Sequence, residues 1–148
     1  MKKVVSLGLL SMLFFLFYPS FALGGEVQIG IRVILASHKG KGVDTGLQDI
    51  QEKLSTLFNY SSYRLLQERS FLLAQGQVGQ LPLTKKKDLR IRLIQEQEGT
   101  VEIAVEILRE GRVIFKTKAK LKKGGTFLIG GPRHKEGVLI LAISAQGP

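Results

Sequence analysis

The residues whose types most suggest chemistry lie in the stretch KKGGTFLIGGPRHKEGVLILAIS, residues 122–144. Its glycine pairs raise the question of a phosphate-binding loop. Such a loop has the pattern G-x-x-x-x-G-K-[ST], because its lysine contacts phosphate and its hydroxyl binds Mg²⁺. Gly125 and Gly130 have the required spacing, but Gly131 and Pro132 follow them. The G-x-G-x-x-G pattern, which must open a helix, is also absent. We therefore interpret both glycine pairs as turns at positive φ.

The two histidines, His38 and His134, offer little for metal binding or catalysis. A metal site takes three or four protein ligands, and no histidine or carboxylate cluster accompanies either residue. There is no cysteine, hence no thiol nucleophile or disulfide, and no G-x-S-x-G motif. We expect no metal, no cofactor and no recognisable catalytic set. A small hydrolase or carbohydrate-acting enzyme is the alternative, since a Ser-His-Asp arrangement is defined by geometry.

Charge provides the stronger lead. The 148 residues carry 22 Lys+Arg against 12 Asp+Glu, a formal net charge of +10. Such a balance favours anionic partners, although it also serves solubility. If three strands alternate as described below, one side of the sheet is basic, and Thr84 to Asp88 adds three lysines at its end. The candidate anion-binding or partner-binding residues are Arg90, Arg92, Arg112, Lys116, Lys118, Lys120, Lys122, Lys85, Lys86 and Lys87.

Three successive segments, 89–93, 101–107 and 113–121, place apolar residues at odd positions and mostly charged residues at even positions. This period of two predicts half-buried strands. Matching faces require odd-length hairpin loops, and residues 97–99 and 109–111 each offer a three-residue loop ending in glycine. The expected inward pairs are Leu93/Ile103, Ile91/Val105, Val105/Phe115 and Ile107/Val113. On the outer face, we expect Arg90 opposite Glu106 and Glu102 opposite Lys118.

The remaining segments complete an α+β pattern. Strands are expected at 26–37, 78–83, 126–130 and 137–145, and one long or bent strand, or two short ones, at 60–77. Residues 45–59 form the expected helix, with a Thr45–Gln48 capping box and an end near Asn59. Its apolar stripe is Leu47, Ile50, Leu54 and Leu57. The stretch VLILAIS, apolar at every position but the last, indicates a strand covered on both faces, under the helix.

This order predicts an antiparallel or mixed sheet of about six to eight strands with one amphipathic helix on a face. The domain spans residues 26–146. Before it, Lys2 and Lys3, the apolar run 4–17, Pro19 and small residues up to Ala22 have the layout of a signal peptide. We expect cleavage of this segment, residues 1–22, near Ala22 or Gly24. The alternative is that the segment is not cleaved and anchors the protein in the membrane. The expected location is periplasmic or secreted. Without Lys2 and Lys3 the chain keeps 20 basic against 12 acidic residues, a net charge of +8.

At GGTFLIGGP, Gly124 to Pro132, the chain resembles the G-x-T-x-x-I-G-G turn of secretin-type outer-membrane channel subunits. More broadly, it resembles the small exported envelope proteins of Gram-negative bacteria. The resemblance supplies no functional residues. We expect a non-enzymatic accessory, assembly or binding factor, acting through its basic sheet face or an exposed edge strand. Its partner would be an envelope protein or an anionic envelope polymer or lipid, because export disfavours nucleic acid. A self-associating structural subunit is a further alternative.

Overall fold

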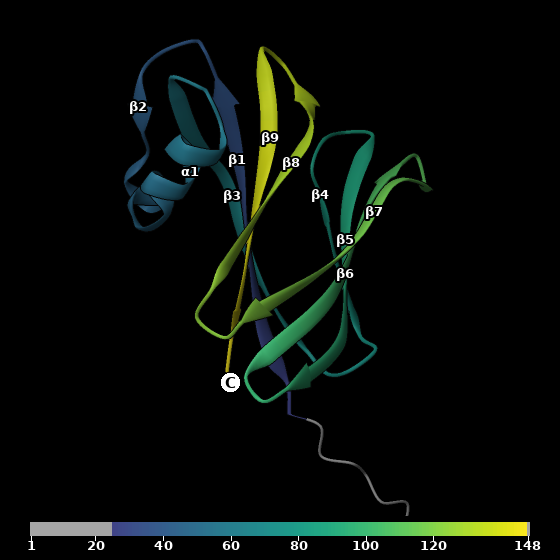
Figure 1. Cartoon of the computed structure of the whole chain (residues 1–148). Helices are drawn as coiled ribbons and strands as arrows, with labels where there is room; N and C mark the ends of the chain where they lie inside the picture. Colours follow the sequence, from purple (N-terminus) through teal and green to yellow (C-terminus); the bar gives the residue numbers. More distant parts are fainter. Residues whose placement is uncertain (1–24, 148) are drawn as a thin grey trace, which may run out of the picture.

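The computed structural model describes residues 25–147, which form a mostly β structure with one short helical segment (Figure 1). The expected signal peptide lies outside these residues. The elements, in chain order, are β1 Val27–Ser37, β2 Gly42–Val43, the 3-10 helix η1 Thr45–Ile50, α1 Gln51–Leu57, β3 Ser62–Leu73, β4 Val78–Pro82, β5 Lys87–Gln97, β6 Thr100–Arg109, β7 Arg112–Lys122, β8 Thr126–His134 and β9 Gly137–Gln146.

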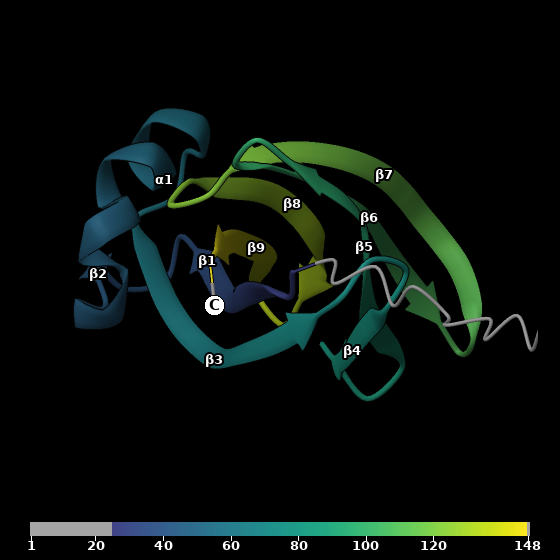
Figure 2. The same ribbon diagram turned by 90° about the horizontal axis from the view of Figure 1, so that it is seen from below.

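The strands form two sheets rather than the single sheet expected from the sequence. One has five strands in the order β2-β3-β1-β9-β8, and the other has four in the order β4-β5-β6-β7. All pairings are antiparallel except β2 with β3, so the larger sheet is mixed. The sheets face each other, and α1 lies on the far side of the larger one (Figures 1 and 2). The chain changes sheet between β3 and β4 and again between β7 and β8, which residue alternation alone does not reveal.

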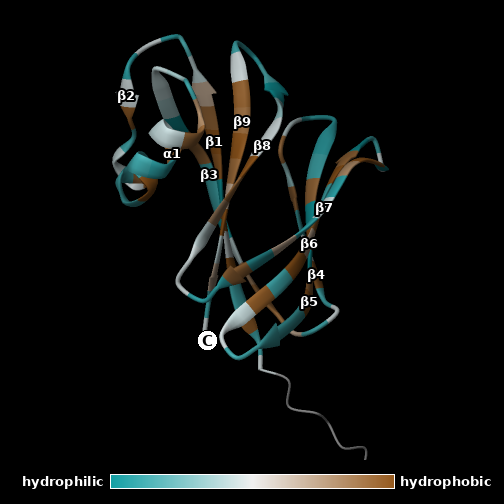
Figure 3. Ribbon diagram, in the orientation of Figure 1, coloured by the Kyte–Doolittle hydropathy of each residue, from teal (hydrophilic) through white to brown (hydrophobic). Residues whose placement is uncertain are grey.

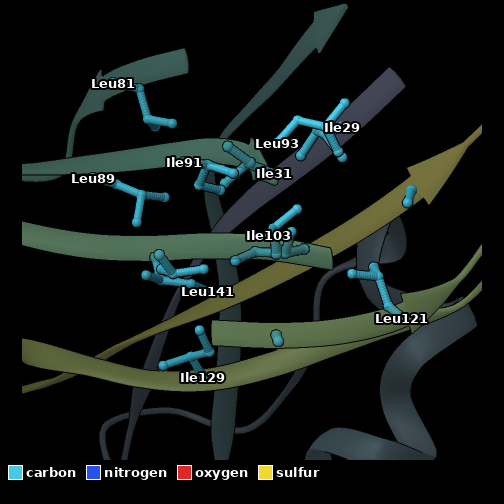
Figure 4. Close-up of a cluster of buried hydrophobic side chains, with 14 of the residues drawn as sticks. Ile29, Ile31, Leu81, Leu89, Ile91, Leu93, Ile103, Leu121, Ile129 and Leu141 are labelled. Atoms are coloured by element: carbon cyan, nitrogen blue, oxygen red, sulfur yellow. The ribbon is translucent and has the colours of Figure 1, made fainter. Parts of the chain in front are cut away.

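The main core lies between the two sheets. Ile31 of β1 and Leu141 of β9 belong to the same buried cluster as Ile91 of β5 and Ile103 of β6 (Figure 4). Each of these side chains is withdrawn from solvent almost completely. Each sheet presents an apolar face to the other, and packing these two faces together removes them from water. This explains the sandwich.

A second core lies between the helical segment and the larger sheet. The odd-numbered residues of β1 face the other sheet, whereas Ile34 and Ala36 contact the helical side together with Ile140 and Ala142 of β9. The prediction that β9 is buried on both faces beneath the helix is therefore confirmed, and Figure 3 shows β9 hydrophobic over most of its length.

The helical segment is shorter and less regular than expected. Leu47, Ile50 and Leu54 are buried as the periodicity predicts, but Leu57 is 63% exposed. The reason is that α1 ends at Leu57 with an extended residue after it, and not in a left-handed cap at Asn59.

The expected capping box is also wrong. Asp44 takes the cap position without a capping side-chain bond, and its carboxylate instead accepts a hydrogen bond from the Leu65 amide at 2.8 Å.

The β5–β6 and β6–β7 hairpin loops of the smaller sheet have two residues and not the predicted three. Both turns contain two residues at positive φ, Glu98-Gly99 and Glu110-Gly111, as in a type I′ turn. The first hairpin nevertheless has the expected pairs Leu93/Ile103, Ile91/Val105 and Arg90/Glu106. A bulge that leaves Ile94 without a partner adds one residue to β5 and restores the register.

In the second hairpin the predicted register is wrong by two residues. The turn and a bulge at Ile114 both displace β7 in the same direction. The observed pairs are Val105/Thr117, Ile107/Phe115 and Glu102/Lys120. From Phe115 to Lys122 the displacement is even, so these side chains keep their expected faces. Val113 and Arg112 precede the bulge, are displaced by one residue and change face, so the prediction that Arg112 belongs to the outer basic face is wrong.

The other strand predictions are confirmed with small changes. Residues 62–73 form one strand, β3, with a bulge at Leu66. The glycine pairs differ from the expected turns: Gly124 has φ of 87°, but Gly130 and Gly131 lie within β8. A Cβ at Gly131 would stand 2.9 Å from the Leu139 carbonyl oxygen, so close approach of β9 requires glycine there.

Candidate anion-binding surfaces

Six basic side chains occupy the outer face of the four-stranded sheet. They alternate with the inward-facing residues of β5 and β7, and we call them the basic sheet face: Arg90, Arg92, Lys116, Lys118, Lys120 and Lys122. The register places Arg90 in one row with Glu106 and Lys116, and Arg92 in the next row with Ala104 and Lys118. The positive charges therefore form two parallel lines along the edge strand β7 and its second neighbour β5.

The carboxylates on this face are fewer, and two of them are held by neighbours. Glu106 pairs with Arg90 at 3.2 Å, and Glu102 accepts a hydrogen bond from the Gln95 side chain at 2.9 Å. With Asp88, which has the same orientation, three carboxylates face six cations. None of the lysines of the basic sheet face forms a salt bridge among residues 25–147. The face thus retains a net positive charge.

The other four predicted residues lie at one end of the sandwich. Arg112 begins β7 next to the β6–β7 turn, Lys85 and Lys86 lie in the β4–β5 turn, and Lys87 is the first residue of β5. The structure ties these two turns together, because the Glu110 amide donates to the Lys86 carbonyl oxygen at 2.9 Å. The Lys86 ammonium also lies 3.8 Å from the Glu110 carboxylate.

The β8–β9 turn joins this end and adds basic residues that the sequence reasoning did not select. A depression of about 430 Å³ is lined by the cations Lys85, Lys86, Lys87, Arg109, Arg133 and Lys135. We call it the basic depression. Thr84 and His134 complete its lining, and the β4–β5 and β8–β9 turns that contribute to it lie at the upper end of Figure 1. Arg109 belongs to the predicted loop 109–111 and could have been selected there, but only the tertiary structure brings the β8–β9 turn to it.

Neither histidine has the surroundings of a catalytic base. His38 is exposed and stacks on Tyr60, with 4.9 Å between ring centroids. His134 lines the basic depression, where the other lining residues are six cations and a threonine. In the part of the chain that the structure describes, no three His, Asp or Glu side chains gather as metal ligands would. The hydrolase alternative gains no support at either histidine.

The helical segment is fixed by polar contacts that lie apart from both basic surfaces. Arg32 of β1 donates to both carboxylate oxygens of Asp49, at 2.7 and 2.9 Å. This bidentate pair holds the pKa of Asp49 below its ordinary value. The Tyr63 hydroxyl donates toward the Phe58 carbonyl oxygen at 2.9 Å, and burial raises the pKa of that phenol.

Comparison with protein-family models, with curated proteins and with solved structures found no match to this chain. No helix among residues 25–147 is long and apolar enough to cross a membrane.

Proposed function

We propose that this protein is an exported, non-enzymatic binding factor of the cell envelope, whose basic sheet face holds an anionic envelope polymer. The observation that carries the proposal is the excess of cations on one regular face, six against three carboxylates. Strand geometry spaces the alternate lysines of β7 about 6–7 Å apart. Such a line of charges suits an extended acidic chain, to which many weak contacts add.

Export is the second part of the proposal and rests on the N-terminal segment. The basic start, the apolar run and the small residues before Leu23 have the three-part layout of a secretory signal. An exported protein meets acidic polysaccharides and acidic lipids rather than nucleic acid. Expression of the full chain in a Gram-negative host, followed by fractionation and N-terminal sequencing, tests this step. A mature protein beginning after Ala22 or Gly24 is expected, whereas an unprocessed protein in the cytoplasm would contradict export.

Polymer binding is tested with immobilised heparin as a model acidic polysaccharide. The variant Lys118→Glu/Lys120→Glu reverses two central charges of the basic sheet face, and Lys41→Glu/Arg69→Glu makes the same charge change at exposed residues elsewhere. An exposed ion pair contributes about 0.2–1 kcal/mol. Reversal removes two attractive contacts and adds two repulsive ones, so binding should weaken at least about fourfold.

The control variant should retain more affinity than the face variant, because it alters only net charge. Equal weakening by both variants would show that net charge, and not this face, determines binding. Absence of salt-sensitive binding by the unaltered protein would contradict the proposal directly, since exposed charges are screened at high ionic strength.

A specific observation also favours a protein partner that adds a strand to β7. This strand is an edge of its sheet, and Val113, Ile114 and Phe115 at its start are each at least 40% exposed. Phe115 was expected to point into the core; it keeps that face, but the opposite sheet does not cover it. Exposed edge strands pair with other chains unless charge prevents it. Sedimentation of the protein and of Ile114→Lys distinguishes self-association, the structural-subunit alternative, from a monomer.

A further inference from the structure

The basic depression is separate from the basic sheet face, and its residues come from two turns and from strand ends of both sheets. Lys85 and Lys86 belong to the β4–β5 turn and Lys135 to the β8–β9 turn. Lys87 begins β5, and Arg109 ends β6. These residues are far apart in the sequence, so their convergence is a property of the fold. It produces a local concentration of positive charge at one end of the sandwich.

At the depression and beside it, like charges stand directly opposite each other in the four-stranded sheet. Lys87 of β5 pairs with Arg109 of β6, and Arg109 pairs with Arg112 of β7. Directly opposed like charges destabilise a sheet. Lys87 lies two residues before the buried Leu89, so it starts from the same inner side of β5. Two basic residues thus begin on the core side of the sheet at its open end.

Little negative charge compensates this arrangement. Among residues 25–147, the salt bridge at the depression is that of Lys86 with Glu110, and both of these side chains are about two-thirds exposed. Glu136, the residue after Lys135, pairs with Lys39 instead. The remaining lysines and arginines of the depression form no salt bridge within the described chain. A bound anion would relieve their mutual repulsion.

The turns are held in place before any ligand binds. The Thr84 hydroxyl accepts hydrogen bonds from the amides of Lys86 and Lys87, at 3.3 and 3.1 Å, which stiffens the β4–β5 turn. The contact between Lys86 and Glu110 described above joins this turn to the β6–β7 turn. Preorganised cations lose less conformational entropy when they bind a ligand.

We infer that the basic depression binds a compact group with several negative charges, of the phosphate monoester or pyrophosphate class. Lysine ammonium groups act as point charges toward phosphate, and arginine can donate two parallel hydrogen bonds to it. A volume of about 430 Å³ suits such a group rather than a folded partner. Apart from His134 the lining contains no aromatic residue, so the site offers little stacking surface for a nucleobase. Free pyrophosphate and a lipid phosphate headgroup share this chemistry.

Isothermal titration with inorganic pyrophosphate tests the inference. The variant Lys87→Gln/Arg109→Gln should bind at least about tenfold more weakly than the unaltered protein, because two charge-assisted hydrogen bonds are lost. The control Lys41→Gln/Arg69→Gln removes the same charge from exposed positions outside the depression and should bind within about twofold of the unaltered protein. Lack of saturable pyrophosphate binding, or equal weakening by both variants, would overturn the site.

Urea unfolding of the same proteins measures the effect of the charges on stability, with and without pyrophosphate. Without ligand, Lys87→Gln/Arg109→Gln should be at least as stable as the unaltered protein, since it removes an opposed like-charge pair. Pyrophosphate should raise the unfolding midpoint of the unaltered protein and leave that of the variant unchanged. If the double variant does not fold, Lys135→Asn replaces it; asparagine tolerates the positive φ of 52° at this position. An unaltered pyrophosphate affinity in Lys135→Asn would then overturn the site.

Flotation with phosphatidylcholine vesicles containing phosphatidic acid distinguishes the two sources of the phosphate group. Binding to these vesicles that is lost in Lys87→Gln/Arg109→Gln identifies a lipid headgroup as a ligand. Binding of pyrophosphate alone identifies a free phosphate compound. Vesicle binding that survives this variant, together with no binding of pyrophosphate, would overturn the inference. The heparin experiment alters Lys118 and Lys120 of the basic sheet face, whereas the pyrophosphate experiment alters Lys87 and Arg109. Heparin binding and pyrophosphate binding can therefore fail independently of each other.

Discussion

Two leucines three residues apart in α1 provide a sharp test of the packing. Leu54 is fully buried against β1 and β9, whereas Leu57 is 63% exposed at the last helical residue. Replacement of a buried leucine by alanine destabilises proteins by about 2–5 kcal/mol, through lost burial and a residual cavity. Leu57→Ala should change stability by no more than about 0.5 kcal/mol, as surface substitutions do. Alanine is also slightly the better helix former, which excludes a propensity loss.

The assay is urea unfolding followed by circular dichroism, with identical buffers and a shared slope for both variants. Leu54→Ala should lower the midpoint clearly, while Leu57→Ala should remain near the unaltered protein. The two positions fit the apolar stripe equally well, so the sequence alone predicts equal losses. A loss in Leu57→Ala as large as that in Leu54→Ala would refute the structural account of this helix. It would mean that α1 continues beyond Leu57 and packs along its whole stripe.

Two further predictions concern a carboxylate and a glycine. Arg32 lowers the pKa of Asp49 in the folded protein. This pair therefore stabilises the protein at pH values above the unfolded aspartate pKa of about 3.9. The stabilisation is lost as the pH falls through the lower folded-state pKa. Asp49→Asn should therefore unfold at lower urea than the unaltered protein near about pH 7, with the difference shrinking toward about pH 3; a constant difference would contradict the linkage. Gly137→Ala should destabilise by about 1–3 kcal/mol or more, because a Cβ there would lie 2.1 Å from the Ala36 carbonyl oxygen, which forces β1 and β9 apart. Gly25→Ala, where no atom lies within 4 Å of the added Cβ, is the matched control in thermal unfolding, and an equal loss there would contradict the explanation.

Strand alternation predicted the smaller sheet well because its faces differ so strongly. Odd-numbered apolar residues are buried in β5 and β6 as expected, and the inward pairs of their hairpin are correct. The predicted register of β7 was wrong because the loop before it has two residues instead of three, and because bulges carry no clear signature in residue type. The unpartnered Ile94 and Ile114 are ordinary β-branched residues, indistinguishable in sequence from their paired neighbours.

Of the two candidate surfaces, one follows from the sequence and the other does not. A period of two assigns Lys116, Lys118 and Lys120 to one side of a strand, whatever its partner, so the basic sheet face follows from the sequence. The basic depression does not, because it depends on which turns meet. Nothing near Lys135 indicates that its turn lies beside Arg109, since their proximity follows from the packing of the two sheets.

Residue order alone predicts the longer strands, the double burial of β9, the position of the helical segment and the separation of charge between the two faces of a strand. These are local properties, set by residue alternation and by the need to remove apolar side chains from water. The division into two sheets, the exposure of Leu57 and Phe115, and the gathering of cations from two turns and three strand ends follow only from the tertiary structure. Those features depend on contacts between residues distant in the chain, where the packing of one sheet fixes what the other can cover.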